Sequence, residues 1–328
     1  MILVAPDSFK GTFSAVEVAG AIARGAESAG ARANRCPVAD GGEGTMDVVL
    51  GALGGTRVEA PAHDPLGRPI VARIGLLDGG ATAIVEAAQA SGLHLVAPGE
   101  RDPEAASTGG TGELIAAAAR TGARRIVVTV GGSATTDGGL GAVEALEAAG
   151  GLGGAEVVVA CDVTTPYELA AEVYGPQKGA DAATVSRLTA RLHERAAALP
   201  RDPRGRPRTG AAGGLSGALW AVYGARLVAG ADWVLDAVGF DARLGRAALV
   251  VTGEGRLDAQ TLEGKAVAAV AARARRAGVP VHAVVGTSAV DAAGAAALGL
   301  ASVREAPSLG ALEAAGAALA ETALGAGR

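Results

Sequence analysis

Polar residues that could bind a phosphorylated ligand follow four short apolar runs of this sequence. In chain order they are Asp7, Ser8 and Lys10 after MILVAP, Ser133, Thr135 and Asp137 after RRIVVTV, Asp162 after VVVAC, and Glu254, Arg256, Asp258, Gln260 and Thr261 after ALVVT. In nucleotide enzymes, carboxylates hold metal ions and cationic side chains hold phosphates. The residue types therefore favour a Mg²⁺-nucleotide site.

Carboxylates recur in these positions and in the glycine-rich segment PVADGGEGT. The six are Asp40, Glu43, Asp137, Asp162, Glu254 and Asp258, and the accompanying cations are Lys10, Lys178, Arg256 and Lys265. Carboxylates gathered at one place repel each other unless a cation or a proton lies among them. Any single one fits a helix cap or a surface ion pair equally well, but six together favour a metal-nucleotide site.

The segment GGSATTDGG has the composition of an anion-binding loop. Its glycines allow the backbone to approach a phosphate, and the amide groups at a following helix start attract anions. Ser133 and Thr135 add hydroxyl donors. A tight strand-to-helix turn with capping hydroxyls is the alternative. No Gly-Lys-Ser/Thr follows, and no G-x-G-x-x-G follows the first apolar run, so a Walker A motif is excluded and a nicotinamide cofactor disfavoured.

Apolar runs alternate with alanine-rich helical stretches along the chain. We expect strands at MILVAPD, RRIVVTVGG, VVVACDV, ALVVTGEG, PVHAVVG and ASVREA, and helices from Val16 to Gly30 and from Lys265 to Gly278. Such runs suit strands that are buried on both faces of a parallel, doubly wound α/β sheet. Ligands of these sheets bind at the carboxyl ends of the strands, where the polar residues lie.

A length of 328 residues favours two domains. The stretch from Thr56 to Ala88 alternates with period two around the turns DPLG and DGG, so it predicts an antiparallel meander. A second segment, from about Tyr167 to Asp236, has helical patterns. We therefore expect a Rossmann-like domain of residues 1–42, 102–166 and 241–328, and a smaller α/β domain formed by the insertions 43–101 and 167–240.

Composition excludes several other classes of protein. A net charge of -5 and only eight aromatic residues argue against nucleic-acid binding. No apolar run is long enough to cross a membrane, and no signal peptide is recognised, so a cytoplasmic protein is expected. In that compartment Cys36 and Cys161 are expected to be buried thiols. The four histidines show no metal-ligand spacing and are read as non-catalytic.

Nine motifs in order resemble the bacterial glycerate kinases of the glycerate kinase type-1 family. They are APDSFKGTFSA, PVADGGEGT, ASGLHLVAPGERDP, STGGTGELI, VGGSATTDGGLG, VACDVT, YGPQKGA, GAAGGLSG and VTGEGRLDAQTLEGKA. The resemblance implies ATP-dependent phosphorylation of D-glycerate, with 2-phosphoglycerate as the expected product. It also implies a discontinuous Rossmann-like domain and an active site in a cleft between two domains.

The resemblance also suggests roles for residues within these motifs. A general base is expected at Asp137 or Asp40, phosphate or carboxylate binding at Lys10 and Arg256, and metal binding at Asp162, Glu254 and Asp258. The remaining substrate- or nucleotide-binding positions are Asp7, Ser8, Gly41, Gly42, Glu43, Thr45, Gly131, Gly132, Ser133, Thr135, Gln177, Lys178, Gly213, Gly214, Gly253, Gly255, Gln260, Thr261 and Lys265.

The sequence departs from the family pattern in its centre. Only GLGGAE lies between GAVEALEAAG and VVVACDV, the stretch before YGPQKGA is compressed, and Thr165 stands where an asparagine is usual. This shortening leaves two alternatives open: a kinase for another small hydroxy acid, and a non-catalytic sensor of glycerate or a nucleotide. The oligomeric state also stays open, with a homodimer among the alternatives.

Overall fold

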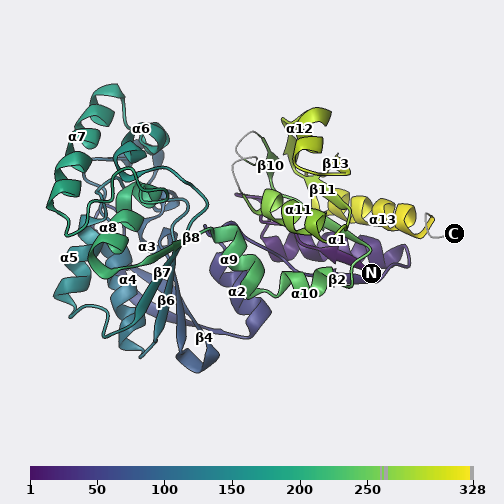
Figure 1. The fold of residues 1–328 in the computed structure, drawn as a ribbon, viewed down its shortest axis with the longest axis horizontal. Coiled ribbons are helices and arrows are strands. Elements are labelled where there is room, and N and C mark those ends of the chain that lie inside the picture. The colour runs from purple at the N-terminus through teal and green to yellow at the C-terminus, as the bar shows by residue number, and fades with distance from the viewer. Residues whose placement is uncertain (259–260, 262–264, 326–328) are drawn as a thin grey trace. The chain divides into compact units, whose positions relative to one another are not determined.

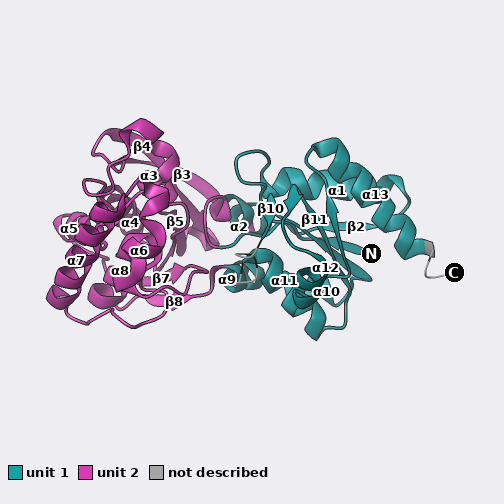
Figure 2. Ribbon diagram, turned by 90° about the horizontal axis from the view of Figure 1, so that it is seen from above, with its two compact units in different colours: residues 1–40, 47–52, 231–328 teal, residues 41–46, 53–230 magenta. Residues whose placement is uncertain are grey.

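The computed structural model describes residues 1–258, 261 and 265–325 and has a mixed α/β fold (Figure 1). The chain forms two compact units (Figure 2). Unit 1 contains residues 1–40, 47–52 and 231–328, and unit 2 contains residues 41–46 and 53–230. Each unit has its own sheet and its own apolar core.

Unit 1 is built on a five-stranded parallel sheet of order β13-β11-β9-β1-β2. Its strands are β1 (Ile2–Val4), β2 (Ala33–Arg35), β9 (Leu249–Thr252), β11 (Val281–Val285) and β13 (Ser302–Glu305). A short parallel pair, β10 (Arg256–Leu257) and β12 (Thr287–Ser288), follows the ends of β9 and β11. The helices are α1 (Ala15–Ser28), α9 (Gly230–Ala237), α10 (Phe240–Leu244), α11 (Ala266–Arg276), α12 (Ala292–Ala297) and α13 (Leu309–Gly325).

Helix α1 shows how local sequence and packing agree in unit 1. Its N-terminus has a capping box, in which the Ser14 side chain accepts from Glu17 N and the Glu17 carboxylate accepts from Ser14 N. Val18 and Ile22 lie on its buried face in the same core as Leu312 of α13. A Cβ on Gly25 would lie 1.8 Å from the carbonyl oxygen of Glu313. The backbones of α1 and α13 therefore approach each other too closely for a larger residue at this point.

Unit 2 contains a six-stranded mixed sheet of order β3-β4-β5-β6-β7-β8. Strands β3 (Thr56–His63), β4 (Pro69–Leu77) and β5 (Thr82–Glu86) are antiparallel, and β6 (Arg125–Thr129), β7 (Glu156–Ala160) and β8 (Arg226–Val228) continue the sheet in parallel from β5. The helices are α3 (Ala88–Ser91), α4 (Gly109–Arg120), α5 (Leu140–Ala148), α6 (Ala170–Tyr174), α7 (Ala182–Ala198) and α8 (Leu215–Tyr223). Helix α2 (Thr45–Leu53) contains residues of both units.

The α6–α7 segment of unit 2 has a small apolar core of its own. Tyr167 is fully buried there, with Leu188 and Leu192 from α7. Helix α7 begins after Asp181, whose side chain accepts from Thr184 N at 2.7 Å. Between the two helices lies the single 3₁₀ turn Pro176–Lys178. This core fixes the position of that turn in unit 2.

The sequence predictions for the local elements are confirmed. All six apolar runs form strands, the two predicted helices correspond to α1 and α11, and the meander corresponds to β3, β4 and β5. The α/β class with parallel sheets is also confirmed. In the structure, no described helix is long and apolar enough to cross a membrane. Cys36 and Cys161 are buried free thiols.

The division into units differs from the predicted boundaries. Residues 102–166 were expected in the first domain, but β6 and β7 belong to the sheet of unit 2, because β6 pairs with β5 from Thr82↔Arg125 to Glu86↔Thr129. Unit 2 is thus formed mainly by one long segment, 53–230, and holds more residues than unit 1. An apolar run indicates a strand, but it does not show in which sheet the strand pairs, and β13 of the run ASVREA is partly exposed rather than buried on both faces.

We predict that Gly25→Ala destabilises unit 1. The added methyl group collides with the Glu313 carbonyl, and overpacking of this kind costs about 1–3 kcal/mol in the free energy of unfolding. Gly20 on the same helix is the matched control, since its Cβ would meet only Arg24 Nη1 at 3.5 Å. Gly20→Ala should be neutral or stabilising by up to about 1 kcal/mol. Urea unfolding of both variants measures the difference, and equal stabilities would contradict the close α1–α13 contact.

Candidate active site

A cavity of about 370 Å³ lies in unit 1 at the carboxyl ends of its parallel strands. Asp7, Ser8 and Lys10 reach it from the loop after β1, and Asp40 from the segment after β2. The loop after β9 contributes Glu254, Gly255, Arg256 and Asp258, Lys265 precedes α11, and Gly286 and Thr287 follow β11. The predicted position of a ligand site at this edge of the sheet thus coincides with a real cavity.

Two glycines let the loop after β9 pass its neighbours. A Cβ on Gly253 would lie 1.9 Å from the carbonyl oxygen of Val284 in β11. A Cβ on Gly255 would lie 3.2 Å from the Cα of Phe9. Close backbone approach, rather than flexibility, therefore accounts for the glycines of TGEG.

Lys10 and Asp40 form an ion pair in this cavity, with 3.1 Å between Lys10 Nζ and Asp40 Oδ2. The side chain of Lys10 is 62% exposed and that of Asp40 is 14% exposed. The carboxylate of Asp40 is the main cause of a raised pKa of Lys10. Lys10 is thus a permanent cation at neutral pH, with its ammonium group accessible to an anionic ligand.

Asp7 and Glu254 are the buried carboxyl groups of the cavity. Burial, reinforced by the charge of Asp40, raises the pKa of Asp7 to about 8, although its Oδ1 accepts from Ser8 N at 2.6 Å. Burial also raises the pKa of Glu254, whose Oε1 accepts from Thr261 Oγ1 at 2.6 Å. Arg256 and Asp258 form an ion pair of 3.5 Å between Nε and Oδ2. The cavity therefore combines carboxyl groups that favour a proton or a cation with three basic side chains.

In unit 2, the loop between β6 and α5 is organised around the buried carboxylate of Asp137. Its Oδ2 accepts from Thr108 N and Thr108 Oγ1, both at 2.8 Å, and from Gly141 N at 3.2 Å. Its Oδ1 accepts from Gly139 N at 3.0 Å. Thr108 Oγ1 in turn accepts from Ala142 N at 3.0 Å. Asp137 thus binds the starts of α4 and α5 together.

Lys178 contacts the same loop from the turn before α7. Its buried Nζ donates to Ser133 Oγ at 3.1 Å and to Thr135 O at 2.5 Å. Burial lowers the pKa of Lys178 to about 7, while the charge of Asp137 opposes that change. Gly213 also packs on this loop, since a Cβ there would lie 2.0 Å from Thr135 O.

The structure divides the predicted site residues between the two units. The residues Asp7, Ser8, Lys10, Asp40, Glu254, Gly255, Arg256, Asp258 and Lys265 line the cavity of unit 1, and Gly253 and Thr261 adjoin it. The residues Gly41, Gly42, Glu43, Thr45, Gly131, Gly132, Ser133, Thr135, Asp137, Asp162, Gln177, Lys178, Gly213 and Gly214 belong to unit 2. Gln260 lies outside the described residues.

Sequence reasoning did not single out Thr287 or Thr108. Thr287 lines the cavity of unit 1 directly after β11, and Thr108 holds Asp137. The strand run PVHAVVG points to Thr287 by the same rule that selected the residues after the other strands. Thr108 lies in the motif STGGTGELI directly before a helix, a usual place for a hydroxyl that caps or clamps.

A metal cage made of protein side chains alone does not fit this site. Over residues 1–258, 261 and 265–325, no three His, Cys, Asp or Glu side chains are grouped closely enough to hold a metal ion. Mg²⁺ in nucleotide enzymes, however, is commonly bound by one or two carboxylates together with phosphate oxygens and water. Glu254 and Asp258 fit that smaller ligand set, because both line the cavity.

Comparison with known proteins assigns the family. A profile described as the glycerate kinase family matches residues 2–150 and 147–323. The chain belongs to the glycerate kinase family. The resemblance carried by the nine sequence motifs is thereby confirmed, and the chain is an enzyme, a kinase of this family.

Individual members of the glycerate kinase family match most of the chain. The glycerate kinase of Bacillus subtilis (strain 168) is 41% identical over 330 residues, which cover 88% of this chain and 86% of that protein. The glycerate 2-kinase of Escherichia coli (strain K12) is 38% identical over 323 residues, covering 87% and 85%. A crystal structure described as glycerate kinase 2 from Salmonella typhimurium LT2 superposes with a TM-score of 0.84 at 36% identity, covering 99% of this chain and 98% of that one.

We predict that Asp137→Asn destabilises unit 2 by at least about 2 kcal/mol, because an amide would place a donor against N–H and O–H groups that need an acceptor. Thr108→Val should show a coupled loss, so that the double variant is less destabilised than the sum of the two single variants. Asp181→Asn is the control, since asparagine caps a helix about as well as aspartate. Strict additivity in urea unfolding would contradict the clamp.

The raised pKa of Asp7 predicts a pH-dependent stability difference. Its pKa is about 8 in the folded chain against an ordinary value of 3.8, so between these values the unfolded chain binds fewer protons. Stability is then lost as pH rises from about 4 to about 8. Asp7→Asn should remove this loss and become steadily more stable than the wild type over that range. Asp78→Asn, in an exposed turn, should show a constant difference from the wild type in thermal unfolding.

Proposed function

We propose that this kinase phosphorylates D-glycerate with ATP and Mg²⁺, and that the product is 2-phosphoglycerate. The observation that carries the proposal is the family match over nearly the whole chain. The names of the relatives, glycerate kinase and glycerate 2-kinase, support the substrate and the position of phosphorylation. The cavity of unit 1 supports it chemically, because it combines accessible cations with carboxyl groups.

Asp40 is the better candidate for the general base. A base must accept the proton of the attacking hydroxyl, so its carboxylate must be accessible to a bound ligand. Asp40 lines the cavity and pairs with Lys10 through Oδ2. Asp137 is buried, and both of its oxygens accept hydrogen bonds from the protein. These contacts suit Asp137 to holding the loop rather than to moving a proton.

The basic residues of the cavity would bind the anionic groups of the reactants. Phosphoryl transfer depends mainly on positioning and on neutralising charge. Lys10, Arg256 and Lys265 supply three positive charges along one cavity, for the phosphates of ATP or the carboxylate of glycerate. Mg²⁺, bound through Glu254 and Asp258, would neutralise the charge that develops on the phosphoryl oxygens. The assignment of Asp162 to the metal stays a prediction from the sequence, as do a homodimer and a cytoplasmic location.

One assay tests the proposed function. The purified chain is incubated with MgATP and D-glycerate, ADP release is followed, and the product is identified by phosphorus NMR. We expect ADP and 2-phosphoglycerate in equal amounts. If ADP were released only with a different hydroxy acid, that acid and not D-glycerate would be the substrate. Ligand binding without ADP release would identify a sensor instead of a kinase.

We predict that Asp40→Asn lowers kcat about 100-fold or more, since a positioned general base contributes about 10²- to 10⁴-fold. The matched control is Asp291→Asn, an exposed N-cap of α12 in the same unit, where asparagine serves equally well. The control should retain wild-type kcat. A near-normal kcat for Asp40→Asn, in a chain that unfolds like the wild type, would remove Asp40 from the role of base.

A further inference from the structure

Lysine is rare in this chain and is confined to candidate sites. The sequence contains three lysines and 26 arginines. Lys10 and Lys265 line the cavity of unit 1. The third, Lys178, is 2% exposed in unit 2. In a chain that uses arginine for nearly all its other positive charges, a buried lysine indicates a position where a compact ammonium group is needed and a guanidinium would not fit.

Within the residues that the structure describes, the ammonium group of Lys178 is not paired with a carboxylate. Its acceptors are two uncharged oxygens, Ser133 Oγ and Thr135 O. Among the described residues, no Asp or Glu oxygen lies within 4.0 Å of its Nζ. The charged groups that face this region are Asp137, whose oxygens bind backbone and Thr108 donors, and Arg101, whose side chain packs against Gly179. A buried positive charge without a counter-ion is costly, so an anionic ligand would relieve it.

The direction of the hydrogen bond to Ser133 follows from the chemistry of the ammonium group. A protonated lysine has three donors and no acceptor. Ser133 Oγ must therefore accept from Lys178, and the Ser133 O–H is left to donate elsewhere. Thr135 Oγ1 is also buried, and it has no hydrogen-bond partner within the described part of the chain. The Ser133 hydroxyl thus contacts the buried ammonium group, and Thr135 carries a second hydroxyl on the same loop.

We propose that Lys178 and Ser133 form an oxyanion subsite in unit 2, in which the Ser133 hydroxyl donates to a carboxylate or phosphate oxygen and Lys178 supplies the positive charge. This inference rests on the proposed function, which provides both kinds of oxyanion: the carboxylate of glycerate and the phosphates of ATP. Lys178 acts through Ser133 and is a positioning residue, because its own Nζ is buried.

Both partners of the subsite are held rigidly. The backbone around Ser133 is fixed by Ala134 N donating to Ser91 O and Leu93 N donating to Gly132 O, each at 2.8 Å. On the other side, Tyr167 Oη donates to Gly138 O at 2.8 Å and so attaches the α6–α7 core to the same loop. A subsite whose members are fixed before the ligand arrives loses little entropy on binding.

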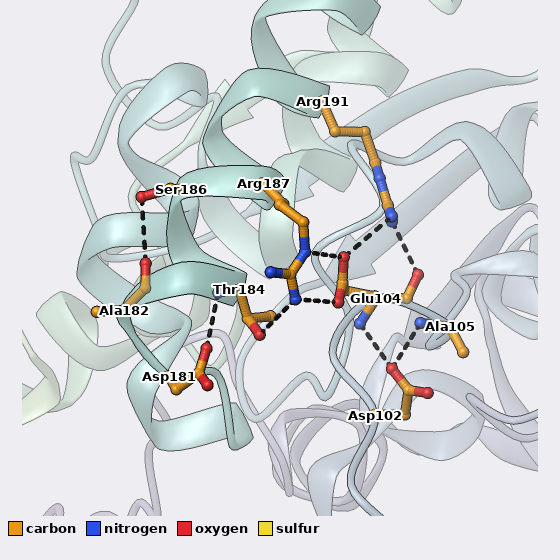
Figure 3. Close-up of polar contacts among 9 residues, drawn as sticks. All are labelled: Asp102, Glu104, Ala105, Asp181, Ala182, Thr184, Ser186, Arg187 and Arg191. Carbon is orange, nitrogen blue, oxygen red and sulfur yellow. Dashed lines mark hydrogen bonds and ion pairs between the residues drawn. The ribbon is translucent and has the colours of Figure 1, made fainter.

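An ion-pair network provides a further attachment for α7. Glu104, in the loop before α4, accepts from Arg187 Nε at 3.0 Å and from Arg187 Nη2 at 2.7 Å (Figure 3). Arg191, one turn further along α7, donates to Glu104 O at 2.8 Å. Asp102 accepts from the backbone N–H groups of Glu104 and Ala105, which keeps this loop in shape (Figure 3). Helix α7, which begins four residues after Lys178, is thereby fixed to the loop before α4 in unit 2.

The test uses Ser133→Ala, Lys178→Met and the double variant in the full chain. Isothermal titration calorimetry measures the Kd of D-glycerate alone and of MgATP alone, at pH 6.5. A hydrogen bond that involves a charged group predicts that Ser133→Ala weakens one of the two ligands about 10- to 100-fold, with the other unchanged. The affected ligand identifies the source of the oxyanion. Ser186→Ala on α7, whose hydroxyl bonds to Ala182 O, is the matched control and should bind both like the wild type.

If Lys178 acts through Ser133, two further results are expected. The double variant should bind no more weakly than the weaker single variant, because both changes remove the same interaction. The affinity of the wild type for the affected ligand should fall as pH rises above about 7. At that pH the Lys178 amine becomes neutral, and the Ser133 O–H turns toward the Lys178 nitrogen instead of the ligand. Lys178→Met should lose this pH dependence. Should Lys178→Met fail to fold, Ser133→Ala alone decides, since it leaves the bond from Lys178 to Thr135 O in place.

The subsite would be overturned if Ser133→Ala bound both ligands as tightly as the wild type does. It would also be overturned if the wild type bound neither ligand. Additive losses in the double variant would overturn the action of Lys178 through Ser133. These outcomes are separate from failure of the proposed function, because calorimetry does not require turnover. If the wild type released no ADP but Ser133→Ala still bound one ligand more weakly than the wild type, the kinase proposal would be contradicted and the subsite would stand.

Discussion

The hydrogen bonds of Asp137 are the interaction on which the loop between β6 and α5 depends. One buried carboxylate accepts from Thr108 and from Gly139 and Gly141, and so joins the starts of two helices that lie far apart in sequence. Removing it would leave several buried donors without an acceptor, which costs more than the net value of the bonds themselves. These hydrogen bonds also help to position Ser133 and Thr135, because both residues lie in the same loop, a few positions before Asp137.

In unit 1 the main electrostatic feature is repulsion among the carboxyl groups of the cavity. This cavity gathers Asp7, Asp40 and Glu254 at one sheet edge, and full ionisation of all three would be unfavourable. The structure relieves the repulsion in two ways: Lys10 pairs with Asp40, and burial raises the pKa of Asp7 and of Glu254. A bound cation would relieve it further. The same repulsion that costs folding free energy therefore favours binding of a cation, which agrees with the proposed Mg²⁺.

Local pattern in the sequence was enough to predict the strands of the six apolar runs, the helices α1 and α11, the meander and the sheet edge of the cavity, but not the short strands β2, β8, β10 and β12. It did not predict that β6 pairs with β5, because strand pairing depends on contacts that leave no mark in the apolar run itself. The motifs name candidate residues along the chain, but they do not describe the contacts that surround each of them. Asp40 and Asp137 both follow a strand and both lie beside glycines, and only the three-dimensional contacts separate them.

Two aspartates of identical chemistry differ here in their surroundings: Asp137 is buried and accepts four hydrogen bonds, whereas Asp40 lines a cavity beside an exposed lysine. Lysines can be separated in the same way, since Lys10 is exposed and paired with a carboxylate, whereas Lys178 is buried and, within the described part of the chain, donates to two uncharged oxygens. Asp137 therefore holds the loop, and the proposed oxyanion would supply the counter-charge of Lys178. Burial and contacts, more than residue type, separate the residues that hold the fold from the candidates for ligand binding.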